Sequence, residues 1–183
     1  MDEKALRVRE RELKIPEYRE SVDALFKNKS SRLIANSSVL HAAVINEMMI
    51  KYTPDNGKVF IFCKDLAKDC FDHPAVIREL KFALQRGIKF FISHTIEPMA
   101  TEFLAILNAK KNEKCTEQVF IRKVRPMQVN GKEINFSTNE YAVRLELDAS
   151  ETTAQVIPYS PDNASVIVEL YSKLQEDCNS ENE

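Results

Sequence analysis

Glycine is scarce in this chain: only three of its 183 residues are glycine. Loops that bind phosphate through backbone amides need several closely spaced glycines, because a side chain would hold the backbone away from the phosphate. The scarcity of glycine therefore excludes the usual glycine-rich phosphate loops of nucleotide-binding enzymes.

Cysteine is also sparse, and its spacing carries no motif. The four cysteines include no Cys-x-x-Cys pair, so neither a disulfide framework nor a zinc site is expected. One of them lies in an apolar run and is expected to be a small buried side chain. We predict no metal and no cofactor, and this cysteine usage fits a reducing cytoplasm. The cysteines are Cys63, Cys70, Cys115 and Cys178.

Long apolar runs and an excess of one charge are missing as well. No stretch approaches the roughly 20 apolar residues that span a bilayer. The N-terminus, MDEKALRVRERELK, is charged throughout and is unlike a secretory signal. We therefore expect a cytoplasmic protein with no membrane partner. The formal charge of −2 gives no overall attraction to nucleic acid but leaves a local basic patch open.

A basic concentration lies between residues 110 and 125. A nucleic-acid backbone needs several such groups on one surface. Glu113 and Glu117 interrupt this stretch, and neighbouring residues of a strand point to opposite faces, which weakens its case as a phosphate-binding surface. The basic residues are Lys110, Lys111, Lys114, Arg122, Lys123 and Arg125.

The stretch from Lys58 to Ser93 predicts a strand–helix–strand unit. Two short apolar runs, VFIFC and IKFFIS, are typical of strands buried on both faces. Between them, residues 74–85 carry apolar side chains at helical spacing, and Gly87 follows where that helix would end. Parallel strands joined in this way place ligand sites beyond their carboxyl ends. Here those ends are Cys63-Lys64-Asp65 and Ser93-His94-Thr95.

The rest of the chain predicts one α/β domain over residues 31–175, with a charged segment at 1–30 and an acidic, disordered tail at 176–183. We expect a mixed sheet with a parallel centre and an antiparallel edge, flanked by helices as a three-layer α/β/α sandwich. Residues 1–15 indicate a weak strand or a frayed helix. Further helices are expected over 16–26, 39–52, 97–109 and from Pro161, and further strands over 32–35, 118–124, 141–147 and 153–158. Asn130-Gly131 predicts a hairpin turn.

Several segments resemble the phospholipase D-like superfamily. They are Asn-Ser-Ser-x-x-His-Ala (residues 36–42), the strand–helix–strand unit, and the closing NFSTNEYAVRLELD and TTAQVIPYSPDNASVIVELYSKL (residues 135–148 and 152–174). The likeness covers about three-quarters of the chain and is to small, single-half bacterial and phage-borne members. It implies the superfamily's fold and a homodimer.

One departure from that superfamily concerns its chemistry. Its enzymes need a His-x-Lys followed by Asp, in which the histidine forms a covalent phosphoryl intermediate. None of the three histidines, His41, His73 and His94, stands in such a motif. Where the superfamily's histidine strand would fall, this chain reads Ile134-Asn135-Phe136-Ser137-Thr138-Asn139. The resemblance therefore implies that the usual phosphodiesterase mechanism is absent.

Histidines near the strand ends are the candidate catalytic residues. His94 directly follows a buried strand, and His41 lies on the first turn of a helix after Ser37-Ser38. Either could act as a proton donor, and either could instead be a structural histidine. His73, before Pro74, is expected to be a surface residue at a helix start.

The candidate binding residues are polar groups near the same edge. Arg144 and Glu146 share one face of a predicted strand, where they could orient an anion, as the resemblance implies, or form a plain ion pair. Asp65, Asp69 and Asp72 could hold Mg²⁺, although a solvated loop with a capping Asp72 explains them as well. The binding candidates are Ser37, Ser93, Asp65, Arg144 and Glu146.

Two functions follow as hypotheses. The first is a catalytically degenerate phospholipase D-like binding or regulatory module, with a protein partner, or a nucleic acid or nucleotide held near His94 and Arg144. The resemblance alone places it in phage or mobile-element conflict with a host. The second is an active phosphodiester or nucleotide hydrolase with a non-standard site of His41, His94, Arg144 and Glu146.

Overall fold

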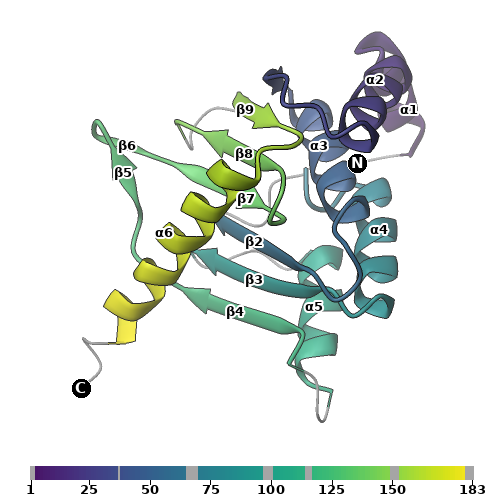
Figure 1. Ribbon diagram of the computed structural model, residues 1–183. Coiled ribbons are helices and arrows are strands. Elements are labelled where there is room, and N and C mark those ends of the chain that lie inside the picture. The colour runs from purple at the N-terminus through teal and green to yellow at the C-terminus, as the bar shows by residue number, and fades with distance from the viewer. Residues whose placement is uncertain are drawn as a thin grey trace.

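The computed structural model describes residues 3–36, 38–64, 70–96, 101–113, 117–148 and 153–179 (Figure 1). Its helices are α1 (Glu3–Glu12), α2 (Ile15–Lys27), α3 (Val39–Lys51), α4 (Pro74–Gln85), α5 (Glu102–Lys111) and α6 (Pro161–Asn179). Its strands are β1 (Ile34–Asn36), β2 (Lys58–Cys63), β3 (Lys89–His94), β4 (Val119–Lys123), β5 (Gln128–Val129), β6 (Lys132–Glu133), β7 (Asn135–Thr138), β8 (Val143–Glu146) and β9 (Ala154–Ile157).

The main sheet is mixed and has the strand order β1-β9-β8-β7-β2-β3-β4. Strands β2, β3 and β4 run parallel, and β7, β8, β9 and β1 add antiparallel neighbours. The strand–helix–strand unit predicted from the sequence is confirmed, because β2 pairs with β3 through the crossover helix α4. The predicted fold class, a mixed α/β sheet with parallel strands flanked by helices, is confirmed.

Helices cover both faces of this sheet (Figure 1). Helices α3, α4 and α5 pack on one face, and α6 crosses the other. Strand β2 shows why both faces are apolar: Ile61 and Cys63 join the core under α4 and α5, whereas Phe60 and Phe62 join the core with Tyr171 of α6. This alternation is the reason that the VFIFC run is apolar throughout.

The N-terminal helices α1 and α2 form an outer layer on α3. Ile15, Val22 and Phe26 of α2 are buried in one cluster with Val44 and Met48 of α3. Of the two alternatives for residues 1–15, a weak strand or a frayed helix, residues 3–12 form a helix, α1. Helix α2 packs in one hydrophobic cluster with α3. At the other end of the chain, α6 continues to Asn179, past residue 175 where we expected the domain to end.

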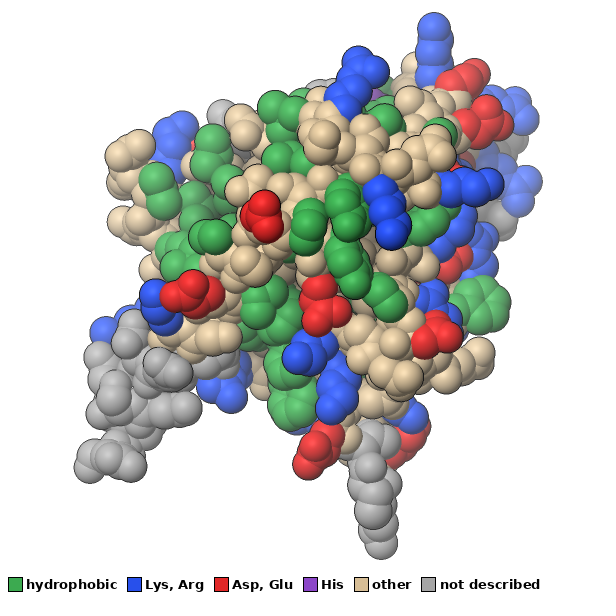
Figure 2. All heavy atoms as spheres, in the orientation of Figure 1, with side chains coloured by type: hydrophobic (Ala, Val, Ile, Leu, Met, Phe, Trp, Pro, Cys, Tyr) green, Lys and Arg blue, Asp and Glu red, His purple; other side chains and the backbone are tan. Residues whose placement is uncertain are grey.

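The surface that carries α6 keeps hydrophobic side chains in view between charged ones (Figure 2). Leu33 is 56% exposed and Val166 60% exposed.

None of the described helices is both long and apolar enough to cross a membrane.

The turn after α4 depends on Gly87. Its φ is +75°, a backbone conformation that favours glycine, and an added Cβ would lie 2.5 Å from Asn56 Oδ1, so the Asn56 side chain would have to shift. Gly131, at φ +76° with nothing within 4 Å of an added Cβ, shares only the first requirement.

We expect Gly131→Ala to lower the free energy of unfolding by roughly 1–2 kcal/mol, the cost of a non-glycine residue in the left-handed conformation. Gly87→Ala should lower it by more than this, because its Cβ also meets Asn56. Adding Asn56→Gly should recover the difference, because it removes the clashing amide. Urea unfolding of the three variants measures this, and equal losses for the two alanine variants would contradict it.

Candidate functional site

The carboxyl ends of the parallel strands carry a row of polar side chains. Cys63 pairs with His94 across β2 and β3, and Asn135 pairs with Glu146 across β7 and β8. The backbone amide of Lys64 donates to Asn135 Oδ1 at 2.7 Å, which joins the two halves of the row. The strands thus end where the sequence predicted, and one edge of the sheet carries the polar groups.

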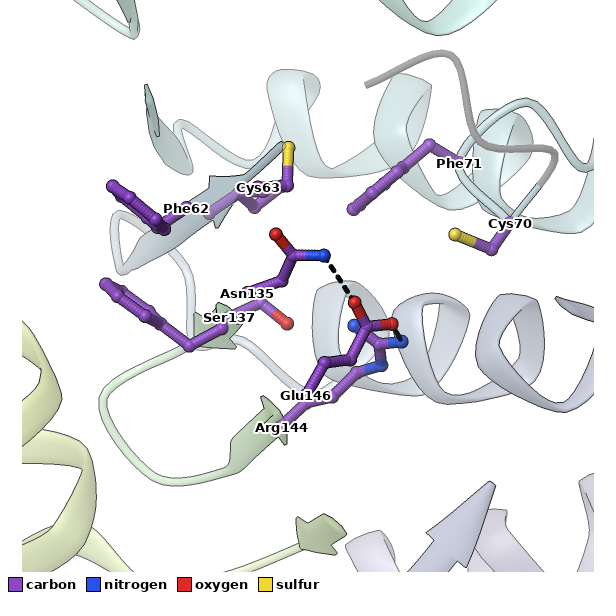
Figure 3. A pocket seen from close by; sticks show the side chains of 10 residues that line it. Phe62, Cys63, Cys70, Phe71, Asn135, Ser137, Arg144 and Glu146 are labelled. Carbon is purple, nitrogen blue, oxygen red and sulfur yellow. Dashed lines mark hydrogen bonds and ion pairs between the residues drawn. The ribbon is translucent and has the colours of Figure 1, made fainter. Parts of the chain in front are cut away.

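A buried ion pair lies at the centre of this edge (Figure 3). Arg144 Nη2 donates to Glu146 Oε1, and the two side chains are only 4% and 3% exposed. Asn135 Nδ2 donates to the other carboxylate oxygen of Glu146. Arg144 and Glu146 are therefore not a surface pair: they satisfy each other inside the protein.

Two polar atoms beside this pair have no hydrogen-bond partner. They are Ser137 Oγ and Arg144 Nε, both fully buried. Ser137 lies opposite Arg144 in the β7–β8 ladder, and both line a cavity of about 10 Å³ with Asn135 and Glu146. That volume holds about one water molecule. The cavity therefore has no room for a substrate group while Arg144 and Glu146 remain paired.

His41 reaches this cluster through Tyr18 of α2. The Tyr18 and His41 rings lie 4.1 Å apart between centroids. Burial raises the pKa of Tyr18 to about 12, and the positive charge of Arg144 acts in the opposite direction. The backbone amide of His41 donates to Ser38, the N-cap of α3, at 3.1 Å. Ser37, also predicted here, lies outside the described residues.

Ser93 and His94 face opposite sides of the sheet. Ser93 Oγ donates to the Tyr171 hydroxyl of α6 at 3.0 Å, and Ser93 is fully buried. His94 faces the other way, and its Nδ1 lies 2.8 Å from the Ile96 carbonyl, so Nδ1 carries the proton. Since strands are spaced about 4.8 Å apart, His94 stands roughly 14 Å from Glu146, three strands away. The predicted binding residue Ser93 therefore lies on the side of the sheet opposite His94.

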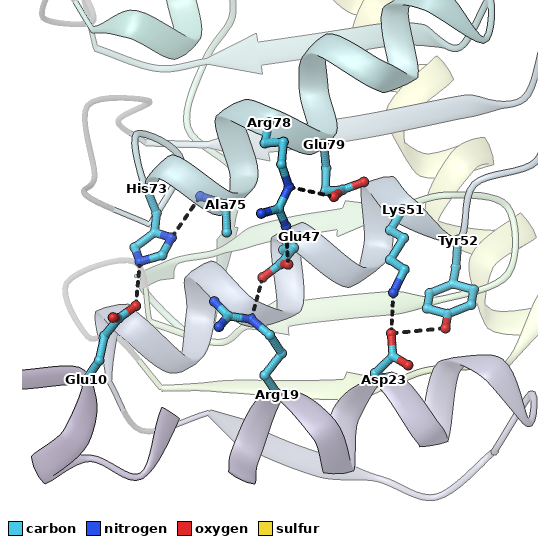
Figure 4. Close-up of polar contacts among 10 residues, drawn as sticks. All are labelled: Glu10, Arg19, Asp23, Glu47, Lys51, Tyr52, His73, Ala75, Arg78 and Glu79. Carbon is cyan, nitrogen blue, oxygen red and sulfur yellow. Dashed lines mark hydrogen bonds and ion pairs between the residues drawn. The ribbon is translucent and has the colours of Figure 1, made fainter. Parts of the chain in front are cut away.

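The prediction that His73 is a surface residue is wrong. Its side chain is only 7% exposed, and its Nδ1 accepts a hydrogen bond from the Ala75 amide as the N-cap of α4 (Figure 4). Its Nε2 lies 3.3 Å from Glu10 Oε1 of α1. Burial lowers the pKa of His73, and Glu10 acts in the opposite direction. His73 thus joins α1 to α4 as a neutral imidazole.

The predicted acidic cluster is only partly described. Asp65 and Asp69 lie outside the described residues, and Asp72 accepts a hydrogen bond from the Phe103 amide of α5 at 3.0 Å. Within the described ranges, no group of three or more His, Cys, Asp or Glu side chains is placed to hold a metal ion.

Sequence reasoning missed the polar residues of β7 as a part of the site. Asn135 and Ser137 stand two residues apart, as Arg144 and Glu146 do, so all four share one face of a hairpin. Matching period-two polar pairs in adjacent strands are the signal that could have found them.

Comparisons with known proteins identify the fold. Searches by sequence match no family model and no curated protein. TrmBL2, described as an archaeal chromatin protein with a novel mode of DNA binding, aligns with a TM-score of 0.50 and 14% identity over 94% of this chain. The chain spans 61% of that protein's length.

A second solved structure is Nuc from Salmonella typhimurium, a phospholipase D family member. It aligns with a TM-score of 0.50 and 16% identity, over 79% of this chain and 94% of Nuc. At these identities the likeness concerns the fold alone. The chain has a phospholipase D-like α/β fold, as the sequence predicted.

The buried ion pair predicts a large response to removing one partner. Glu146→Gln leaves Arg144 without its counter-charge, so we expect the free energy of unfolding to fall by about 3–5 kcal/mol. Replacing both, Arg144→Met with Glu146→Leu, should restore most of that loss. The control is Glu169→Gln, which breaks the exposed Glu169–Lys173 pair and should cost less than about 1 kcal/mol. Urea unfolding measures all three, and equal losses for the two glutamine variants would contradict the prediction.

The buried state of His73 predicts a loss of stability in mild acid. Because burial lowers its pKa below the ordinary value of 6.5, the unfolded chain binds a proton that the folded chain excludes. The free energy of unfolding should therefore fall as the pH drops below 6.5 toward the folded pKa. The charged groups around the ring are Glu10, Arg19 and Glu47.

His73→Asn keeps a capping side chain and removes the titration. Urea unfolding between about pH 7 and about pH 5 should show a smaller loss for this variant than for the wild type. Parallel curves for the two proteins would disprove the assignment.

Proposed function

We propose that this chain is a catalytically inactive phospholipase D-like module that acts by binding. The observation that carries the proposal is the polar pair of β7. Asn135 and Ser137 stand on the strand where the resemblance puts the superfamily's His-x-Lys. A carboxamide offers no nucleophilic lone pair comparable to an imidazole, and Asn135 already uses both ends of its amide on Lys64 and Glu146.

The closed state of the polar edge supports the same proposal. A hydrolase of the second hypothesis would need Arg144 and Glu146 to face a substrate together with His41 and His94. Arg144 and Glu146 instead bond to each other beside a cavity of about 10 Å³, and the His94 Nδ1 is engaged by the Ile96 carbonyl. A protein that binds its partner at another surface does not need Arg144, Glu146 or His94 to be available to a ligand.

The proposed partners are a second copy of the chain and a protein or nucleic-acid ligand. Nucleic acid is favoured by one solved neighbour, TrmBL2, whose description names DNA binding. The setting in phage or mobile-element conflict is part of the proposal and comes from the sequence resemblance.

The proposal predicts no hydrolysis of phosphodiesters. We expect purified protein to turn over bis(4-nitrophenyl) phosphate and single-stranded DNA no faster than His41→Ala/His94→Ala protein, because Asn135 stands where the superfamily's nucleophilic histidine strand would fall. Release of nitrophenol and gel analysis of the DNA provide the measurement, with divalent cations both present and chelated.

Turnover that His94→Ala abolishes while the circular dichroism spectrum stays unchanged would establish the hydrolase instead. Lys173→Gln, an exposed change on α6, is the matched control variant, because it should leave any genuine turnover intact.

A further inference from the structure

A second hollow lies at the opposite edge of the sheet from the polar row. Thr138, at the end of β7, pairs with Phe60 near the start of β2, so the turn after β7 lies at the amino ends of the parallel strands. The ends of α2 and α3 and the turn before α6 meet there. They form a hollow of about 190 Å³, which we call the tyrosine pocket. Its lining includes Phe26, Lys27, Lys29, Tyr52, Tyr141 and Tyr159.

Two pairs of stacked aromatic rings form the walls of the tyrosine pocket. Tyr141 and Tyr159 are nearly parallel, with an angle of 7° and 5.8 Å between ring centroids. Phe26 and Tyr52 stack at 5.9 Å and 29°. Tyr141 is 37% exposed, so part of this residue is open to solvent. Flat aromatic faces at the surface are the groups on which nucleic-acid bases stack.

The most exposed of these rings is held in place by its backbone. The amides of Tyr141 and Ala142 donate to Asn139 Oδ1 at 3.2 and 2.8 Å, and Asn139 Nδ2 donates to the Met49 carbonyl at 2.8 Å. The Tyr141 carbonyl accepts from the Ser160 amide at 2.6 Å. A ligand that stacks on Tyr141 therefore meets a preformed platform and loses little free energy in ordering it.

The two charged residues that line the tyrosine pocket, Lys27 and Lys29, are both lysines. Lys29, with φ +50°, holds its Nζ 5.5 Å from the centre of the Tyr159 ring. Within the described part of the chain, neither Lys27 nor Lys29 has a carboxylate within 4 Å. The nearby Asp23 is already bound to Lys51 Nζ at 2.6 Å and to the Tyr52 hydroxyl at 3.0 Å (Figure 4).

The two lysines narrow the class of ligand that this aromatic pocket can bind. A cationic ligand is disfavoured, since Lys29 already occupies the cation position over Tyr159. A ligand with a flat ring and an attached anion matches both features of the pocket. The base and phosphate of a nucleotide have this chemistry.

We infer that the tyrosine pocket binds a nucleobase by stacking on Tyr141 and the attached phosphate through Lys27 and Lys29. The inference rests on the proposed role as a binding module and specifies its ligand. The same chemistry could come from a free mononucleotide or from one residue of a single strand, and the two probes below separate these sources.

The experiment measures binding of thymidine monophosphate by calorimetry and of fluorescein-labelled oligo(dT) by anisotropy, using the full chain. Tyr141→Leu removes the stacking surface and should weaken binding about tenfold. Lys29→Gln should weaken binding and lower the salt dependence of oligo(dT) binding by about 0.7 in log–log slope, the value for one lost phosphate contact on a single strand.

The matched controls are Phe82→Leu, a 48% exposed ring on α4, and Lys173→Gln, an exposed lysine on α6. Both controls should bind as the wild type does. Binding of thymidine monophosphate identifies the free nucleotide as sufficient, and binding of oligo(dT) alone identifies a single strand.

Two results would overturn the inference: binding of neither probe, or binding that both pocket variants leave at the level of the controls. Because Lys29 is exposed, Lys29→Gln keeps the test decisive if Tyr141→Leu fails to fold. Neither result bears on catalysis, which is measured as hydrolysis and with the His41 and His94 variants.

Discussion

The buried pairing of Arg144 with Glu146 is the constraint on which the middle of the sheet depends. The two residues are 3% and 2% exposed, and a charge so far from water must be paired and hydrogen-bonded. Glu146 has one carboxylate oxygen on Arg144 and the other on Asn135, which in turn accepts the Lys64 amide. The side-by-side order of β8, β7 and β2 thus follows from this polar chain as well as from the backbone ladders.

The same pairing gives the two edges of the sheet different chemistry. At the carboxyl ends of the parallel strands, where α/β proteins commonly bind ligands, Glu146 bonds to both Arg144 and Asn135. At the amino ends, tyrosine rings and lysines remain open around the tyrosine pocket. We therefore propose that the polar edge contributes to stability and that the ligand binds at the other edge.

Polar contacts outside the sheet hold the N-terminal helices to this framework. Glu47 of α3 is 3% exposed and accepts from Arg19 of α2 at 2.9 Å and from Arg78 of α4 at 3.2 Å (Figure 4). The Glu10–His73 contact adds α1. These contacts help a segment as charged as residues 3–27 to pack on the domain: Glu10, Arg19 and Asp23 have specific partners. Apolar residues of α2, among them Ile15, Val22 and Phe26, pack in one cluster with α3.

The parts of the fold that the sequence predicted are those whose pattern of apolar residues depends only on their own strand or helix. The apolar runs of β2 and β3, the helical spacing of α4 and the stop at Gly87 each have a local cause, and all were predicted. Strand β7 was not predicted from its own pattern, because Asn135, Ser137 and Thr138 look like loop residues. They are buried because Glu146 and the Ala142 carbonyl, on the next strand and its turn, bond to Asn135 and Thr138.

The candidate site likewise has features that the sequence predicted and features that only the structure shows. The sequence by itself determined the α/β class, the strand ends at Cys63 and His94, and the lack of a His-x-Lys motif, because periodicity and residue chemistry are local properties. Only the tertiary structure decided that Arg144 and Glu146 are sealed inside, that His73 is buried, and that Tyr141 and Tyr159 stack. The burial of a side chain and its bonding partners depend on which distant segments of the chain pack together. The local sequence around a residue does not specify those segments.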